Sequence, residues 1–177
     1  MAFEPAELWE SSAEAPLDEG VEESPEAFVE RWREHAVDAV LFPRPEGVPL
    51  LECEVGGTVI QVFERTGPYL SRPGPAKLIV NPTTAALVPA GPAELPRVET
   101  RGLSRLAAVG TVVRREGRVV VVDAGVPLVV AVEGALPAGV GPGSLVAFES
   151  EAPVHGFVVS GARYAVHRRE GSDDAAW

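Results

Sequence analysis

Proline and glycine recur so often along this chain that long helices have little room. The sequence holds 17 prolines and 18 glycines in 177 residues, and ten of the prolines fall between positions 43 and 96. Proline lacks an amide hydrogen and has a fixed φ angle, so it interrupts helices and central strands alike. Short apolar runs between such breaks are typical of turn-rich β proteins. We therefore expect a mainly β fold.

The length and composition allow a well-packed soluble protein. A chain of 177 residues suits one large domain or two small barrels, and its 46% hydrophobic and 23% charged residues are near globular averages. Cys53 is the only cysteine, so no disulfide can form within the chain. The acidic start lacks the pattern of a signal peptide, and apolar runs such as residues 126–132 are too short to span a membrane. We expect a cytoplasmic protein without a membrane partner.

The negative charge is concentrated near the N-terminus. The formal net charge is −11, and residues 1–40 carry twelve acidic residues against Arg31 and Arg33. Residues 101–171 instead carry eight arginines against six acidic residues. The acidic total therefore leaves room for a locally basic face.

The N-terminal region divides into an arm and a helix. Residues 1–23 are rich in Glu, Ser, Ala and Pro and have few branched apolar side chains, so we expect a disordered acidic arm. Ser24 suits an N-cap and Pro25 suits the first helical position. The expected helix ends at Pro43. Its apolar face consists of Val29, Trp32, Ala36, Ala39 and Val40.

Residues 50–64 predict a β-hairpin. Gly56 and Gly57 can adopt the positive φ angles that a two-residue turn requires. The register set by this turn gives one apolar face, on which Val55 faces Thr58, Cys53 faces Ile60 and Leu51 faces Val62. Cys53 is therefore expected in the core. With the helix and a strand at 77–81, this hairpin makes a small β module over residues 24–100.

Residues 101–170 predict a second, more regular β module. Five consecutive strands are expected at residues 106–115, 118–123, 126–133, 144–151 and 154–160. Glu116-Gly117 closes the first pair, and a three-residue turn with Gly125 in the left-handed region closes the second. A longer connection, 134–143, separates the third strand from the fourth.

This strand pattern, LAAVGTVVRREGRVVVVDAGVPLVVAVEG followed by GSLVAFESEAPVHGFVVS, resembles the oligonucleotide/oligosaccharide-binding (OB) fold over about residues 103–162. That fold is a partly open five-stranded barrel. The resemblance implies a five-stranded OB-like barrel similar to single-strand-binding members. The usual helix after the third strand is missing, because ALPAGVGPG is rich in Gly and Pro. An SH3-like barrel is the alternative.

No catalytic centre can be recognised in the sequence. The histidines at positions 35, 155 and 167 are scattered and the single cysteine lies in a strand pattern, so no metal site is expected. The sequence GPGS at 141–144 lacks the lysine and the spacing of a phosphate-binding loop. We expect a protein that is not an enzyme and that needs no cofactor.

Arginines flank both ends of the expected barrel. Three surround its first turn, and three follow its last strand: Arg114, Arg115, Arg118, Arg163, Arg168 and Arg169. Guanidinium groups pair with phosphates and stack on bases. The aromatic residues that can stack beside them are Phe148, Phe157 and Tyr164. These nine residues form the predicted nucleic-acid-binding site.

Residues 171–177, GSDDAAW, form an expected acidic tail. It resembles the acidic, Phe-ended tip with which bacterial single-stranded-DNA-binding proteins recruit partners. Asp173, Asp174 and Trp177 match that pattern, although Trp replaces Phe and the preceding proline is absent. The resemblance implies a partner-binding role for these three residues.

Two functions are consistent with these patterns. The first is a non-enzymatic binding protein, accessory to DNA or RNA metabolism, whose OB-like barrel engages single-stranded nucleic acid while the acidic arm competes for the basic face. The alternative is a protein–protein assembly or structural module without nucleic acid. It follows from the continuous aliphatic strands 119–122 and 126–132, which need cover from another module, a second subunit or a partner. We expect a protein partner or self-association.

Overall fold

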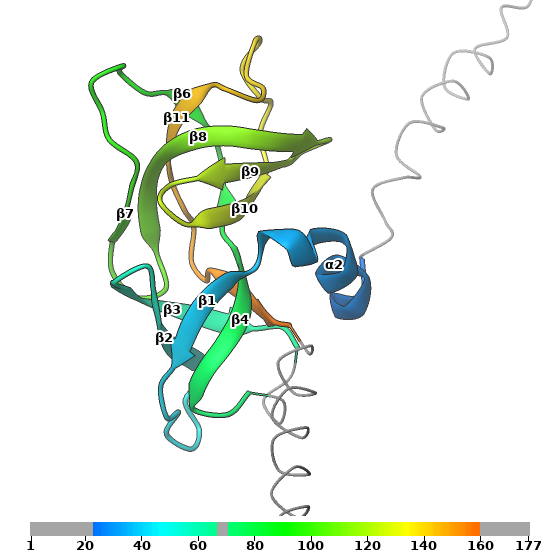
Figure 1. Ribbon diagram of the computed structural model, residues 1–177, viewed down its shortest axis with the longest axis vertical. Coiled ribbons are helices and arrows are strands. Elements are labelled where there is room, and N and C mark those ends of the chain that lie inside the picture. The colour runs from blue at the N-terminus through cyan, green and yellow to red at the C-terminus, as the bar shows by residue number, and fades with distance from the viewer. Residues whose placement is uncertain (1–22, 67–70, 160–177) are drawn as a thin grey trace, which may run out of the picture.

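The computed structural model describes residues 23–66 and 71–159, and β-strands dominate them. The expected mainly β fold with one short helix and barrel-like curvature is confirmed. Figure 1 shows two curled β units, one above the other, with the helix beside their junction. The expected acidic arm, apart from Glu23, and the acidic tail lie outside the described residues. Within the described ranges, no helix has the length and apolar character needed to cross a membrane.

The helix α2 (Pro25–Trp32) begins where the sequence predicts but ends early. The Oγ of Ser24 accepts a hydrogen bond of 3.2 Å from the amide three residues on, as an N-cap does. A 3₁₀ turn, η1 (Arg33–His35), follows, and the chain then enters strand β1 (Val37–Leu41). The prediction of a helix up to Pro43 is therefore wrong. Burial alternates along β1, and pairing with two neighbouring strands outweighs the local helical periodicity.

The lower unit is a closed five-stranded barrel, called the first barrel below. Its strands are β1, β2 (Leu50–Val55), β3 (Thr58–Glu64), β4 (Gly74–Asn81) and β12 (His155–Val158). They follow the order β1-β2-β3-β12-β4, and β4 pairs back with β1. Strand β12 runs parallel to β3 and antiparallel to β4. Inward side chains such as Leu41, Cys53, Val62 and Leu78 fill the barrel.

The hairpin of β2 and β3 has the predicted register. Gly56 and Gly57 have φ angles of +55° and +81°, as the two-residue turn requires. Val55 pairs with Thr58. The other two predicted pairs, Cys53 with Ile60 and Leu51 with Val62, are also present. The turn also touches the upper unit, because a Cβ at Gly56 would lie 2.6 Å from Val126 Cγ1. Glycine therefore serves both the turn and the contact between the units.

The upper unit is a curled seven-stranded sheet, called the second sheet below. Four of its strands match the prediction: β8 (Leu106–Glu116), β9 (Val119–Asp123), β10 (Pro127–Val132) and β11 (Leu145–Glu149). Three short strands complete it: β5 (Thr83–Thr84), β6 (Val88–Pro89) and β7 (Arg97–Thr100). The order is β5-β10-β9-β8-β11-β6, and β7 pairs with β8. Gly125, with φ of +91°, ends the β9–β10 turn as expected.

The predicted fifth strand lies elsewhere. Residues 154–160 were expected to complete a barrel with β8 to β11, but β12 leaves that sheet and inserts between β3 and β4 of the first barrel. Gly156 suits this position, because it packs closely against the side chains of Val62 on β3 and Leu78 on β4, and a Cβ there would force them to shift. Strand alternation alone does not say which sheet a strand joins. The second sheet is therefore inserted between the fourth and fifth strands of the first barrel.

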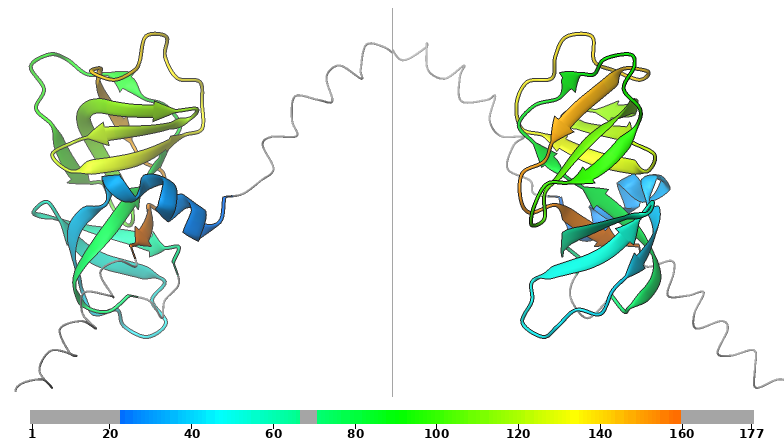
Figure 2. Two further views of the ribbon diagram at one scale, coloured as in Figure 1. Left: turned by 45° about the vertical axis from the view of Figure 1, so that its right-hand side comes forward. Right: turned by 90° about the vertical axis from the view of Figure 1, so that its left-hand side faces the viewer.

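An apolar cluster joins α2 to both units. It is separate from the main core and contains Val29, Trp32, Ile79, Val121, Val129, Phe157 and Val159. Trp32 is fully buried, and Val121 and Val129 come from the outer faces of β9 and β10. Figure 2 shows α2 lying along the junction between the units. The aliphatic strands that were expected to need cover therefore receive part of it from the protein's own helix.

Replacing Gly156 with alanine should lower the free energy of unfolding by about 1–3 kcal/mol, because overpacking a tight core strains its neighbours. The added Cβ would lie 2.7 Å from Val62 Cγ2 and 3.3 Å from Leu78 Cδ1, contacts that exist only with β12 between β3 and β4. Urea unfolding followed by tryptophan fluorescence measures the change. Gly91→Ala, at a position with no atom within 4 Å, is the matched control. Equal stability of the two variants would contradict the placement of β12.

Candidate binding surfaces

The three arginines of the β8–β9 turn do not form one cluster. A bulge between Val112 and Arg114 shifts the register, after which Arg114 pairs with Val121 and Arg115 with Val120. Val121 belongs to the cluster under α2, whereas Val120 faces the interior of the second sheet. Because side chains alternate along a strand, Arg114 lies on the helix side and Arg115 on the other side.

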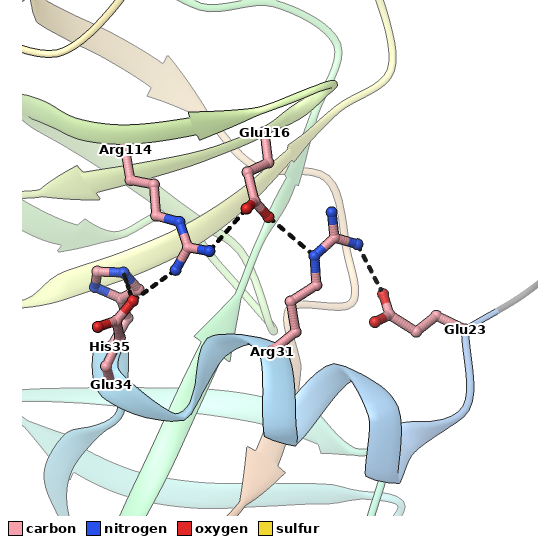
Figure 3. Close-up of polar contacts among 6 residues, drawn as sticks. All are labelled: Glu23, Arg31, Glu34, His35, Arg114 and Glu116. Carbon is pink, nitrogen blue, oxygen red and sulfur yellow. Dashed lines mark hydrogen bonds and ion pairs between the residues drawn. The ribbon is translucent and has the colours of Figure 1, made fainter.

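Arg114 ties the second sheet to the helix region (Figure 3). Its Nη1 donates to Glu34 Oε1 at 2.6 Å, and its Nη2 donates to Glu116 Oε1 at 2.8 Å. Arg31 Nε donates to the other oxygen of Glu116 at 2.9 Å. The hydrogen bond from Arg114, followed by that from Arg31, lowers the pKa of Glu116.

The same guanidinium packs on an aromatic ring. The Cζ of Arg114 lies 4.6 Å from the ring centroid of Trp32, and the Cζ of Arg31 lies 5.3 Å from it. Both distances are in the range of cation–π contacts, so two guanidinium groups pack on one ring. Arg114 is therefore engaged in fastening α2, which packs on the outer face of β9 and β10.

Arg115 and Arg118 lie together at the end of the second sheet. Arg115 Nη1 donates to the carbonyl of Val140 at 2.8 Å, and Arg118 Nη1 donates to the carbonyl of Glu133 at 3.1 Å. Both side chains are exposed, and neither pairs with a carboxylate of a described residue. These two hydrogen bonds hold the connection after β10 in place. Each guanidinium group has further N–H groups that can donate to a ligand.

The two aromatic residues of the predicted site that the structure describes are buried. Phe148 is 4% exposed in the main core, and Phe157 is 5% exposed and stacks on Phe28 with 4.3 Å between ring centroids. Neither offers a ring face to a base, so the expected stacking role is wrong for both in this arrangement. In its strand, each phenylalanine occupies a position whose side chain points to an apolar face, and this position explains its burial.

The remaining predicted site residues lie outside the described part of the chain: Arg163, Tyr164, Arg168, Arg169, Asp173, Asp174 and Trp177.

The lower end of the first barrel has a pocket that the sequence interpretation missed. Its volume is about 240 Å³, and it is lined by Phe42, Pro43, Arg44, Leu51, Ser71, Arg72 and Pro73. Two proline-rich loops form it, one after β1 and one before β4. The sequence shows an arginine beside prolines in each loop. The pairing of Leu41 with Gly74 brings the two loops together, and no sequence pattern indicated that pairing.

A buried carboxylate organises this pocket. The side chain of Glu64 is 1% exposed and accepts hydrogen bonds from Ser71 Oγ at 2.7 Å and Arg44 Nη2 at 3.3 Å. Arg44 is thereby held and neutralised. Arg72 is exposed and has no hydrogen bond or ion pair with the described residues, so it is the free cation of the pocket.

Aromatic residues accompany these cations. Phe42 lines the pocket, and Phe63 on β3 is 40% exposed beside His155, with 6.1 Å between ring centroids. Burial lowers the pKa of His155, and the charge of Arg65 lowers it further, so the imidazole is neutral at pH 7. The lower end therefore combines planar rings with guanidinium groups.

A larger groove, about 420 Å³, lies on the outside of the second sheet. Small side chains such as Ala107 and Ala147 form its floor. Its charges pair with one another: Arg97 with Glu94 and Glu99, and Arg101 with Glu99 and Glu149. With its arginines engaged in this way, the groove offers a ligand no free cation.

The described residues contain no group of three or more metal-ligating side chains. Cys53 is fully buried in the first barrel, and burial, with a smaller effect of Glu52, raises its pKa to about 12. The Oγ of Ser150 accepts a hydrogen bond from the amide of Leu106 and so serves the fold.

No known family matches the chain, and no curated protein is similar to it in sequence.

Arg114→Ala should destabilise the protein by about 1 kcal/mol, mainly through loss of the cation–π contact with Trp32, because ion pairs to exposed carboxylates contribute little. Thermal unfolding measures the change. Arg118→Ala removes the same charge without a ring contact and should stay within about 0.5 kcal/mol of the unmodified protein. If Arg118→Ala proved the more destabilising, the assignment of Arg114 as the fastening residue would be incorrect.

Cys53 should resist thiol reagents at pH 8 in the folded protein and react fully in urea, because only the thiolate is nucleophilic. Since the folded pKa lies above the unfolded value, the stabilisation from the neutral thiol is complete below about pH 8.5 and decreases toward pH 12. Rapid labelling of the native protein at pH 8 would contradict this burial.

Proposed function

We propose that this protein is a non-enzymatic binding protein that engages single-stranded nucleic acid at the lower end of its first barrel. The site comprises Phe42, Phe63 and Arg72, with Arg44 beside them. The observation that carries the proposal is the guanidinium of Arg72, unpaired among the described residues, in one pocket with the ring of Phe42 at the end of a closed five-stranded barrel.

The strand order supports an OB-like assignment of the first barrel. The strand β1 pairs with both β2 and β4, and the last strand lies parallel to β3 and antiparallel to β4. In OB folds the ligand contacts the face of the second and third strands and the loop after the first strand. Here that loop carries Phe42 and Arg44, and β3 carries Phe63. The expected OB resemblance thus moves from the second module to the first.

The chemistry of the lower end suits a single strand. Every base has a π-face that can stack on a phenylalanine, and a guanidinium can pair with the adjacent phosphate. Hydrogen-bond readout is not required, so such a site tolerates many sequences. The abundant acids elsewhere in the chain oppose binding at long range, which makes the proposed affinity modest and dependent on salt.

The location proposed with this function is the cytoplasm, where a lone thiol such as that of Cys53 stays reduced.

A second candidate, protein–protein assembly, is favoured by exposed aliphatic residues on another part of the first barrel. Val40 on β1 and Val59 on β3 are 43% and 45% exposed, one on each side of β2.

Arg72→Ala combined with Phe63→Ala should weaken binding of a fluorescein-labelled oligo(dT) or oligo(rU) by about tenfold or more, since stacking on one aromatic residue contributes roughly 1–3 kcal/mol per base. Arg72→Ala alone should reduce the slope of log affinity against log salt by about one. Fluorescence anisotropy across a salt series measures both quantities. Neither residue supports the barrel core, so circular dichroism should be unchanged.

Arg115→Ala with Arg118→Ala is the matched control. It removes two exposed arginines from the second sheet and should change oligonucleotide affinity less than twofold. Loss of binding in this variant alone would move the site to the second sheet, as the sequence first suggested. Absence of binding by the unmodified protein at low salt would refute nucleic-acid binding altogether.

A further inference from the structure

We infer that the outer face of the first barrel binds a basic, aliphatic segment of a partner protein. This face, called the acidic face below, consists of Val40 on β1, Glu52 and Glu54 on β2, and Val59 on β3. It adjoins the proposed nucleic-acid site, because the amide of Phe42 donates a hydrogen bond to the carbonyl of Glu52, but it contains no residue of that site, so this inference does not depend on nucleic-acid binding.

Strand pairing places these side chains in one row. Val40 pairs with Glu54, and Glu54 pairs with Val59, so one carboxylate lies between two valines. Directly paired side chains lie roughly 5 Å apart. Glu52 follows two residues along the same face, roughly 7 Å from Glu54, because the strand rises about 3.3 Å per residue. The acidic face is therefore a pair of carboxylates, in which Glu54 lies between two valines and Glu52 pairs with Gln61.

Both carboxylates lack a counter-charge from the described residues. Glu52 and Glu54 are exposed and have neither a hydrogen bond nor an ion pair to a cation there. The nearby ammonium group of Lys77 forms an ion pair with Asp38, with 2.5 Å between Nζ and Oδ1. Two like charges on one strand face repel each other, and a cationic ligand removes that repulsion.

The combination of groups identifies the ligand class. Lysine and arginine have aliphatic stems that cover apolar surface while their charged ends reach a carboxylate. Stems over Val40 and Val59 with charged ends at Glu54 and Glu52 use every group of the face. An extended segment repeats its side chains on one face at about 7 Å, which matches the spacing of the two carboxylates.

Other ligand classes fit poorly. Phosphates are repelled by the two carboxylates, and a metal ion would find only two ligands. A partner cannot bind here by adding a strand to the sheet, because β1 and β2 are each paired on both edges. Recognition on this face therefore uses side chains, and a basic segment with aliphatic residues satisfies them.

The test uses a fluorescein-labelled peptide of alternating lysine and valine, with a peptide of alternating glutamate and valine as the ligand control. Anisotropy at low ionic strength should show binding of the full-length protein to the first peptide and none to the second. Glu52→Gln with Glu54→Gln should weaken binding at least tenfold. Val40→Ser with Val59→Ser should weaken it about threefold to tenfold, which separates a surface contact from long-range attraction.

The matched control is Glu133→Gln with Glu151→Gln. It changes the net charge equally at two exposed residues whose carboxylates have no partner in the described part of the chain. It should alter peptide affinity less than twofold, and so should Arg72→Ala. Equal weakening by both glutamine pairs, or no effect of the serine pair, would overturn the acidic face as a site. Tight binding of an oligonucleotide with unchanged affinity in Arg72→Ala would refute the proposed function without touching this inference.

Discussion

The pairing of β12 with β3 and β4 is the constraint on which the rest of this structure depends. Without it the first barrel has a gap between its third and fourth sequential strands. The same short strand supplies Phe157, which packs with Trp32 in the cluster that fixes α2 to the second sheet. Val159, directly after β12, hydrogen-bonds to the carbonyl of Lys77 and completes the cluster. One four-residue strand thus closes a barrel and anchors a helix.

Local patterns predicted the local structure well. The Gly56-Gly57 turn determined the register of β2 and β3, and the turns at Gly117 and Gly125 delimited β8, β9 and β10. The failures are non-local. Residues 37–41 have a sequence compatible with the end of a helix, but pairing to β2 and β4 makes them a strand. The sheet that receives β12 depends on contacts more than 70 residues away along the chain.

The candidate site was harder to predict than the fold. The run Arg114-Arg115 looks like a cluster in one dimension, but strand alternation after a bulge sends the two side chains to opposite faces. Arg44 and Arg72 are 28 positions apart in the sequence, yet they line the same pocket because β1 ends and β4 begins at one end of the barrel. Charge counts along a sequence give totals, whereas a binding surface depends on which face each charge occupies.

The insertion of the second sheet into the first barrel orders events during synthesis. When β4 leaves the ribosome, β3 and β4 each have an unpaired edge, and the strand that will cover both has not yet been translated. The intervening residues 82–154 form the second sheet, so the barrel remains open while an entire unit is made. Unpaired edges attract other strands, including those of neighbouring chains. A nascent chain of this protein therefore passes through an interval in which two strand edges of its barrel are open to wrong pairing, and only the arrival of β12 ends that interval.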